Sequence, residues 1–163
     1  MIVVSNASPV INLAAIDRLD LLRSLFGEIV IPRAVFDEVA VAGEGDPGSI
    51  EVRTFEWIRT AEVANRTLVM SLSLEMDDGE AEAVALACEM RADLVLLDEK
   101  IAREAAFRIG LKCAGVIGML VEAKRRALIP SVKPLLDELV VKAGFRVSPS
   151  LYERVLQTAG ERR

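Results

Sequence analysis

Two carboxylates stand at the far ends of a helix and a strand that follow one another in the sequence. Glu80 opens a stretch, residues 79–91, whose apolar residues recur at helical spacing, and Asp98 follows an unbroken apolar run at residues 94–97. The helix advances roughly 18 Å and a strand over residues 93–98 returns roughly 17 Å, so an antiparallel course brings the two side chains together. Such carboxylates repel each other, and the pair usually needs a cation or a raised pKa for one member. The spacing therefore predicts a cation-binding or acid–base site.

Two further oxygen-bearing side chains are expected at the same place. Asn6 directly follows an apolar strand predicted at residues 2–5, and Glu38 lies a turn or two into the helix after a strand predicted at residues 29–31. Parallel sheets bind ligands at the carboxyl ends of their strands. Any single acid at a helix start is more often a cap or a solvated charge, so the prediction rests on the convergence of all four side chains.

The residue types that are absent narrow the chemistry. The sequence has no histidine, which excludes histidine general bases, Ser-His-Asp triads and zinc sites built on histidine. It has neither a GxGxxG motif nor a P-loop, which disfavours nucleotide-cradling folds. Cys88 and Cys113 lie among apolar neighbours and are interpreted as core residues in a reducing compartment. Carboxylates therefore carry the pattern.

The net charge of −5 makes the chain a poor non-specific binder of nucleic acid. A nucleic-acid function would need a local basic surface or a metal ion that bridges to phosphate. With one Trp and one Tyr, platforms for base stacking are scarce.

Apolar strands alternate with amphipathic helices along the chain, which is typical of an α/β fold with a parallel sheet. We expect a three-layer α/β/α architecture with a mainly parallel central sheet and extra C-terminal helices. The 163 residues, 52% of them hydrophobic, suit a single domain over residues 1–163, with a core at about 1–127 and a C-terminal helical extension at about 130–160. Further strands are expected at 55–60 and 112–114, and further helices at 20–26, 62–75, 99–109, 115–127, 130–143 and 148–158.

Three local features carry their own predictions. Ser8 ahead of Pro9 predicts that Ser8 caps the first helix and that Pro9 is its first residue. Residues 43–49 predict a surface turn or a flexible lid. In the helix expected at 99–109, Ile101 is expected to face inward with two alanines.

Four short motifs hold the four site residues in order: Asn6 in Asn6-Ala7-Ser8, Glu38 in VFDEV, Glu80 in DGEAEA and Asp98 in LLDEK. In these motifs the chain resembles the PIN-domain family, the fold of the VapC-like toxin ribonucleases. It is most similar to a prokaryotic PIN-like branch with an SNxSP start and a GEAEA helix. The tail segments SVKPLLDEL and GFRVS fit that branch too, so the resemblance covers nearly the whole chain.

The resemblance implies metal-dependent hydrolysis of phosphodiester bonds in single-stranded or structured RNA. It implies Mg²⁺ or Mn²⁺ held by Asn6, Glu38, Glu80 and Asp98, with the three acids as catalytic residues. Mg²⁺ takes hard oxygen ligands and keeps several waters. Such an ion can neutralise phosphate charge and acidify a bound water, and needs no histidine.

Asn6 departs from the family pattern, which has an acid there. An amide oxygen can ligate an ion but brings no charge, so the site holds about three formal negatives and binds a divalent ion less tightly. Two alternatives therefore stay open: an active nuclease, or a catalytically attenuated module that binds RNA or a protein. Asn6 also has an ordinary structural role available, which is to satisfy backbone groups at the turn.

Several neighbours are candidates for lesser roles. Ser8, Lys100 and Arg103 are predicted substrate contacts, although capping is the commoner duty of a serine at that place. Glu99 is a weaker candidate, because an acid at a helix start also suits the helix dipole. Asp37 is expected to face away from Glu38 as a surface charge.

Partners and location follow from the composition and the resemblance. Apolar richness predicts an interface, for which a homodimer is the default, and the resemblance implies an antitoxin protein. No apolar run approaches about 18 residues, and the first residues lack a basic segment, so we expect a cytoplasmic protein without a membrane span. A receiver-type phosphotransfer domain is a weaker alternative, because no Thr/Lys pair follows on later strands.

Overall fold

A computed structural model describes residues 1–162, which contain a five-stranded parallel sheet of order β3-β2-β1-β4-β5. In register, Val4 lies opposite Val30 on one side and Val95 on the other. Every residue of β1 is buried, as in a strand that is covered on both faces. The three-layer α/β/α prediction is confirmed. The strands are β1 (Val3–Ser5), β2 (Ile29–Pro32), β3 (Ile58–Ala61), β4 (Leu94–Leu96) and β5 (Cys113–Ala114).

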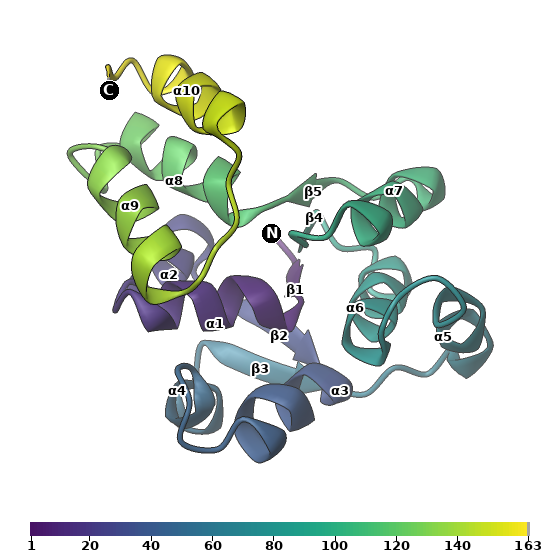
Figure 1. Cartoon of the computed structure of the whole chain (residues 1–163). Helices are drawn as coiled ribbons and strands as arrows, with labels where there is room; N and C mark the ends of the chain where they lie inside the picture. The colour runs from purple at the N-terminus through teal and green to yellow at the C-terminus, as the bar shows by residue number, and fades with distance from the viewer. Residues whose placement is uncertain (163) are drawn as a thin grey trace.

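Helices cover both faces of the sheet (Figure 1). The first and last helices of the chain pack on one face, and the helices between β3 and β5 pack on the other. On the first face lie α1 (Ala7–Ala15), α2 (Asp20–Phe26), α8 (Val116–Arg125), α9 (Lys133–Lys142) and α10 (Pro149–Thr158). On the second lie α5 (Arg66–Leu72), α6 (Asp78–Glu89) and α7 (Lys100–Ile109). Near β3 lie α3 (Arg33–Phe36), the π-helix η1 (Asp37–Ala42) and α4 (Ser49–Thr54).

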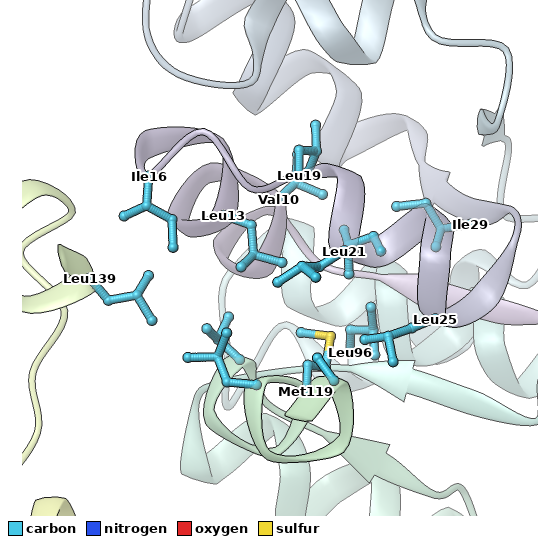
Figure 2. Close-up of a cluster of buried hydrophobic side chains, with 14 of the residues drawn as sticks. Val10, Leu13, Ile16, Leu19, Leu21, Leu25, Ile29, Leu96, Met119 and Leu139 are labelled. Carbon is cyan, nitrogen blue, oxygen red and sulfur yellow. The ribbon is translucent and has the colours of Figure 1, made fainter. Parts of the chain in front are cut away.

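The larger apolar cluster joins the two ends of the chain. In Figure 2, Leu13 of α1 lies among side chains that include Met119 of α8 and Leu139 of α9. Because the C-terminal helices contribute to the cluster that also buries α1, they hold the first strand-to-helix connection in place. That connection carries Asn6 and Ser8.

The central helix α6 is buried on all sides over residues 79–87. It contacts α3, α5 and α7 as well as three strands. Asp77 caps it, since the Asp77 carboxylate accepts a hydrogen bond from the Glu80 N–H at 2.8 Å. The predicted start of this helix is therefore confirmed. Its buried N-terminal part carries two acids, Glu80 and Glu82.

Some local predictions are wrong. The first helix begins at Ala7, so Asn6 precedes it and Ser8 is not its cap; Pro9 is tolerated because N–H groups in the first turn have no partner within the helix. The turn at residues 43–48 leads into α4, a helix that the sequence pattern did not suggest. Ile101 is 53% exposed, because α7 buries Ala102 and two further alanines.

Other local predictions are confirmed. The helix expected at 148–158 is α10, which Ser148 caps by accepting the Leu151 N–H at 3.2 Å. Asp37 is a surface charge that pairs with Arg33 at 3.1 Å. Cys88 and Cys113 differ from the prediction of core residues, since both are free thiols in only partly buried positions. Within residues 1–162 no helix combines the length and apolar character that crossing a bilayer requires.

Candidate active site

Three oxygen atoms from three separate segments meet over the α-carbon of Gly79. A methyl group placed on Gly79 would lie 3.1 Å from Oε1 of Glu38, 3.4 Å from Oδ1 of Asn6 and 3.6 Å from Oδ1 of Asp77. Only glycine leaves this space open, since a side chain there would press on the Glu38 carboxylate. We call the group formed by Asn6, Glu38, Asp77 and Gly79 the Gly79 cradle.

Glu38 reaches the cradle through a widened helical turn. Helix α3 changes into the π-helix η1 at Asp37, and the Gly43 N–H donates to the Glu38 carbonyl at 2.9 Å. A π-turn inserts an extra residue into the helical repeat and is common at functional sites. Gly43 is needed to close it, because a methyl group there would lie 2.9 Å from the Val39 carbonyl oxygen. Partial burial, and next the Asp77 charge, raise the pKa of Glu38.

Asn6 is the polar anomaly of the site. Its side chain is 5% exposed, and its Oδ1 is a buried side-chain atom that has no hydrogen-bond partner among residues 1–162. Its amide does not cap α1, so the ordinary structural role for this residue is not used. A buried acceptor without a donor usually costs about 1–3 kcal/mol. This oxygen faces the cradle and is available to a ligand.

Glu80 lies beside another acid rather than a base. Burial is the largest cause that raises the pKa of Glu80 to about 7, followed by hydrogen bonding between its carboxyl group and that of Asp77 and by the Asp77 charge. No cation pairs with Glu80 in the described part of the chain. At neutral pH its carboxyl group therefore sits near the midpoint of its titration, which suits proton transfer.

Asp98, in contrast, is held by donors. Its Oδ1 accepts the Val116 N–H at 2.9 Å, and its Oδ2 accepts the Ser8 hydroxyl at 3.1 Å. Ser8 is itself oriented by Asn12, whose amide donates to Ser8 Oγ at 3.2 Å. Burial raises the pKa of Asp98, while the two hydrogen bonds and the Arg103 charge act in the opposite direction. The carboxylate is thus fixed in orientation.

A second glycine allows this arrangement. A methyl group on Gly115 would lie 2.8 Å from Oδ1 of Asp98 and 3.4 Å from Nη1 of Arg103. Arg103 therefore stands next to Asp98, and its role as a substrate contact stays a prediction. The negative charge of Glu99 acts on both Glu80 and Asp98, since it raises the pKa of each.

The remaining prediction at this edge concerns Lys100. Its side chain is 83% exposed and its Nζ lies 3.9 Å from Glu104, so the structure does not draw it toward the carboxylates. Conversely, the sequence interpretation assigned no site role to Asp77, Gly79 or Gly115. A glycine or an aspartate at a helix start has an ordinary explanation in sequence, and only the approach of distant segments reveals its second role.

The donor set fits a hard divalent cation. The cradle offers one amide oxygen without a partner and two carboxylates, with Glu80 adjacent, and Mg²⁺ is commonly bound through one or two carboxylates plus several waters. Within residues 1–162, no group of three or more Asp, Glu, Cys or His side chains is close enough to hold a metal by itself. An ion at this place would thus depend on Asn6 and on water for part of its coordination.

The comparison with protein families agrees with this geometry. The family model described as DUF3368: PIN domain matches residues 2–161. The search of curated proteins found no significant match. PIN domains are generally nucleases, which supports a hydrolytic enzyme with a nuclease-type fold. The parallel sheet, the acids at its carboxyl edge and a match over nearly the whole sequence lead to one assignment: the chain belongs to the PIN-domain family.

Proposed function

We propose that this protein is a divalent-metal-dependent endoribonuclease that hydrolyses phosphodiester bonds in RNA. The observation that carries the proposal is the Gly79 cradle, in which the orphaned Asn6 Oδ1 and the Glu38 carboxylate face one space. Asn6 Oδ1 is a buried acceptor without a donor, which is unfavourable unless a ligand meets it. Glu38, Glu80 and Asp98 are the proposed catalytic residues, and these three with Asn6 are the proposed metal ligands. Mg²⁺ or Mn²⁺ bound there would offset phosphate charge and acidify a water.

Each protein group has a separate role in this proposal. Glu80, whose pKa is raised to about 7 by burial and by Asp77, would release its proton when it binds the ion. Asp98 keeps a fixed orientation because Ser8 and the Val116 N–H hold its two oxygens. Arg103 supplies a guanidinium group beside Asp98, where it can bind a phosphate oxygen.

The biological setting proposed is that of a toxin in a toxin–antitoxin pair, acting on RNA in the cytoplasm. The protein partners are a homodimeric second copy and an antitoxin. This setting is supported by the family resemblance to VapC-like toxins. Exposed apolar side chains such as Met70 and Leu74, which are 72% and 87% exposed, are consistent with a protein interface.

The direct test is cleavage of single-stranded RNA by the purified protein, free of any partner, in Mg²⁺, in Mn²⁺ and in EDTA. We expect cleavage with either ion, none in EDTA, and a strong loss in Asp98→Asn. Asp93→Asn is the matched control, because Asp93 lies before β4, at its amino end, where it accepts the Ile2 N–H. The proposal fails if neither ion supports cleavage, or if Asp98→Asn cleaves as well as Asp93→Asn.

One specific observation favours a second candidate, an attenuated PIN-like module that binds RNA or a protein. The residue at the first acidic position is the uncharged Asn6, which lowers the charge available to an ion. Asn6→Asp separates the two. A large gain of cleavage from an inactive parent supports the attenuated module, whereas clear activity in the parent supports the nuclease.

A further inference from the structure

A groove of about 980 Å³ runs between α7 and the strands β4 and β5. It begins beside the candidate active site, because Arg103 both lines the groove and stands next to Asp98 over Gly115. Figure 1 shows α7 running alongside the end of the sheet that carries β5. We propose that this groove binds the single-stranded RNA segment adjacent to the scissile phosphate, an inference that rests on the proposed nuclease function. We call it the α7 groove.

The charge of the α7 groove is opposite to that of the whole protein. Four cationic side chains line it against one carboxylate, Glu104, although the chain carries a net charge of −5. Lys100 lies 3.9 Å from Glu104 and Arg108 pairs with Glu75 at 3.0 Å, whereas Lys112 makes no ion pair with any residue from 1 to 162 and keeps its charge free. Such a cationic strip supplies the local basic surface that an acidic protein needs in order to hold phosphates. The four cations are Lys100, Arg103, Arg108 and Lys112.

Phe107 gives the groove an aromatic platform. Its side chain is 79% exposed, although burying a phenylalanine is strongly favourable. It lies four residues after Arg103 on α7, so the two side chains occupy neighbouring turns of the same helix face. Single-stranded nucleic acids are held by this combination, in which cations contact the backbone and an aromatic ring stacks on a base.

A second groove shows why charge and not size selects the site. A larger groove, of about 1420 Å³, lies among α1, α2 and α4 and includes residues just before β2 and β3, at the amino end of the sheet. It contains Trp57 and Phe55, but six carboxylates line it against two cations. Phosphates would be repelled there, and the groove is at the wrong end of the strands to reach Asp98. Of these two grooves, the smaller α7 groove is the one that combines the required charge with access to the candidate active site.

The test is fluorescence anisotropy of a labelled single-stranded RNA in EDTA, where binding is measured without cleavage. Phe107→Ala should weaken binding about tenfold through lost base stacking. Lys112→Gln should weaken binding and reduce the slope of log affinity against log salt by about 0.7. Val141→Ala and Arg154→Gln are matched controls, because Val141 is 81% exposed on α9 and Arg154 is an exposed cation on α10.

The outcomes separate this inference from the proposed nuclease function. Groove-dependent RNA binding without cleavage in Mn²⁺ would support the groove and contradict the nuclease. Cleavage and binding that are unchanged in both groove variants would overturn the groove and leave the nuclease standing. A groove variant that keeps RNA affinity but changes the sedimentation coefficient would also overturn the inference, since the groove would then be a contact between copies of the chain.

Discussion

Glu80 and Glu82 lie two positions apart on α6 and are nearly equally buried, at 8% and 7% exposure, yet their surroundings are opposite. Glu82 accepts the Ala34 N–H at 3.0 Å and pairs with Arg66 at 2.9 Å. Glu80 faces the Asp77 carboxyl group, and burial together with that neighbour raises its pKa to about 7. The fold thus supplies hydrogen-bond and ion-pair partners to the Glu82 carboxylate, whereas it places another acid beside the Glu80 carboxylate.

This difference distinguishes structural from functional charge. Glu82 ties α6 to α3 and to the start of α5, so its partners come from the fold itself. The charged groups that act on Glu80 are the carboxylates of Asp77 and Glu99, neither of which is a cation. A titratable group perturbed by burial and by a like charge, at a sheet edge where ligands bind, is a candidate for function.

The largest effect on stability should come from removing the Glu82 carboxylate, whose partners belong to the fold. Glu82→Ala leaves the half-buried Ala34 N–H without its acceptor and Arg66 without its partner, and we expect the free energy of unfolding to fall by about 2–3 kcal/mol. Urea denaturation measures it. Glu104→Ala is the control, since an exposed surface pair contributes about 0–1 kcal/mol. Equal losses of stability in the two variants would contradict the structural role of Glu82.

The next largest effect is expected when a negative charge is added to the Gly79 cradle, where it should strengthen cation binding. Asn6→Asp supplies a further carboxylate to the Gly79 cradle, and we expect Mn²⁺ affinity measured by calorimetry to rise about tenfold, or about 1.4 kcal/mol. In EDTA the same variant should be less stable, because a further like charge is buried. Lower Mn²⁺ affinity in Asn6→Asp would mean that the cradle is not a cation site.

The raised pKa of Glu80 predicts a pH dependence with a definite sign. The folded protein retains a proton on Glu80 up to about pH 7, whereas the unfolded chain releases it near the ordinary value of 4.5. In EDTA, stability should therefore fall as pH rises from about 4.5 to 7, by at most about 1.4 kcal/mol per pH unit for this group.

Glu80→Gln should flatten that slope, and saturating Mn²⁺ should reverse part of the loss in the parent protein. Chemical denaturation at several pH values measures both effects. Glu62→Gln, at an exposed position after β3, is the control and should keep the parent slope. A parent whose stability rises over this pH range would contradict the pKa shift.

The smallest effect is expected at the fixed carboxylate. Ser8→Ala removes one donor from Asp98, which still accepts the Val116 N–H, so we expect a loss of about 1 kcal/mol. The pKa of Asp98 should rise further, and NMR titration of its side chain would show it. Ser24→Ala, at an exposed place on α2, serves as control. No change in either quantity would mean that Ser8 does not hold Asp98.

The sequence predicted the framework well because periodicity and caps are local. The apolar runs at β1, β2 and β4 and the helical spacing of apolar residues in α6 are each visible in a few adjacent residues. The same reasoning predicted four oxygen-bearing side chains at the carboxyl edge of the sheet, and the structure brings two of them, Asn6 and Glu38, together over Gly79.

What the sequence did not predict depends on contacts between distant segments. Ser8 has the local signature of a cap, but its hydroxyl serves Asp98, ninety positions away. The π-turn that turns Glu38 toward Gly79 has no local signature, and the role of Gly79 exists only because Asn6 and Glu38 approach it. Phe107 is 79% exposed because alanines fill the buried face of α7, and the sequence pattern assigned it no role.

The central claim is that the Gly79 cradle binds a divalent cation, and a Mn²⁺ titration by calorimetry at pH 7.5 tests it most directly. The proteins to compare are the parent, Gly79→Ala and Gly118→Ala. Both substitutions add a methyl group within a helix, but nothing lies within 4 Å of it at Gly118, whereas Glu38 Oε1 would lie at 3.1 Å at Gly79. We predict equal Mn²⁺ affinity in the parent and Gly118→Ala, and affinity about tenfold lower in Gly79→Ala. Equal affinity in all three proteins, or no binding to the parent, would contradict the claim.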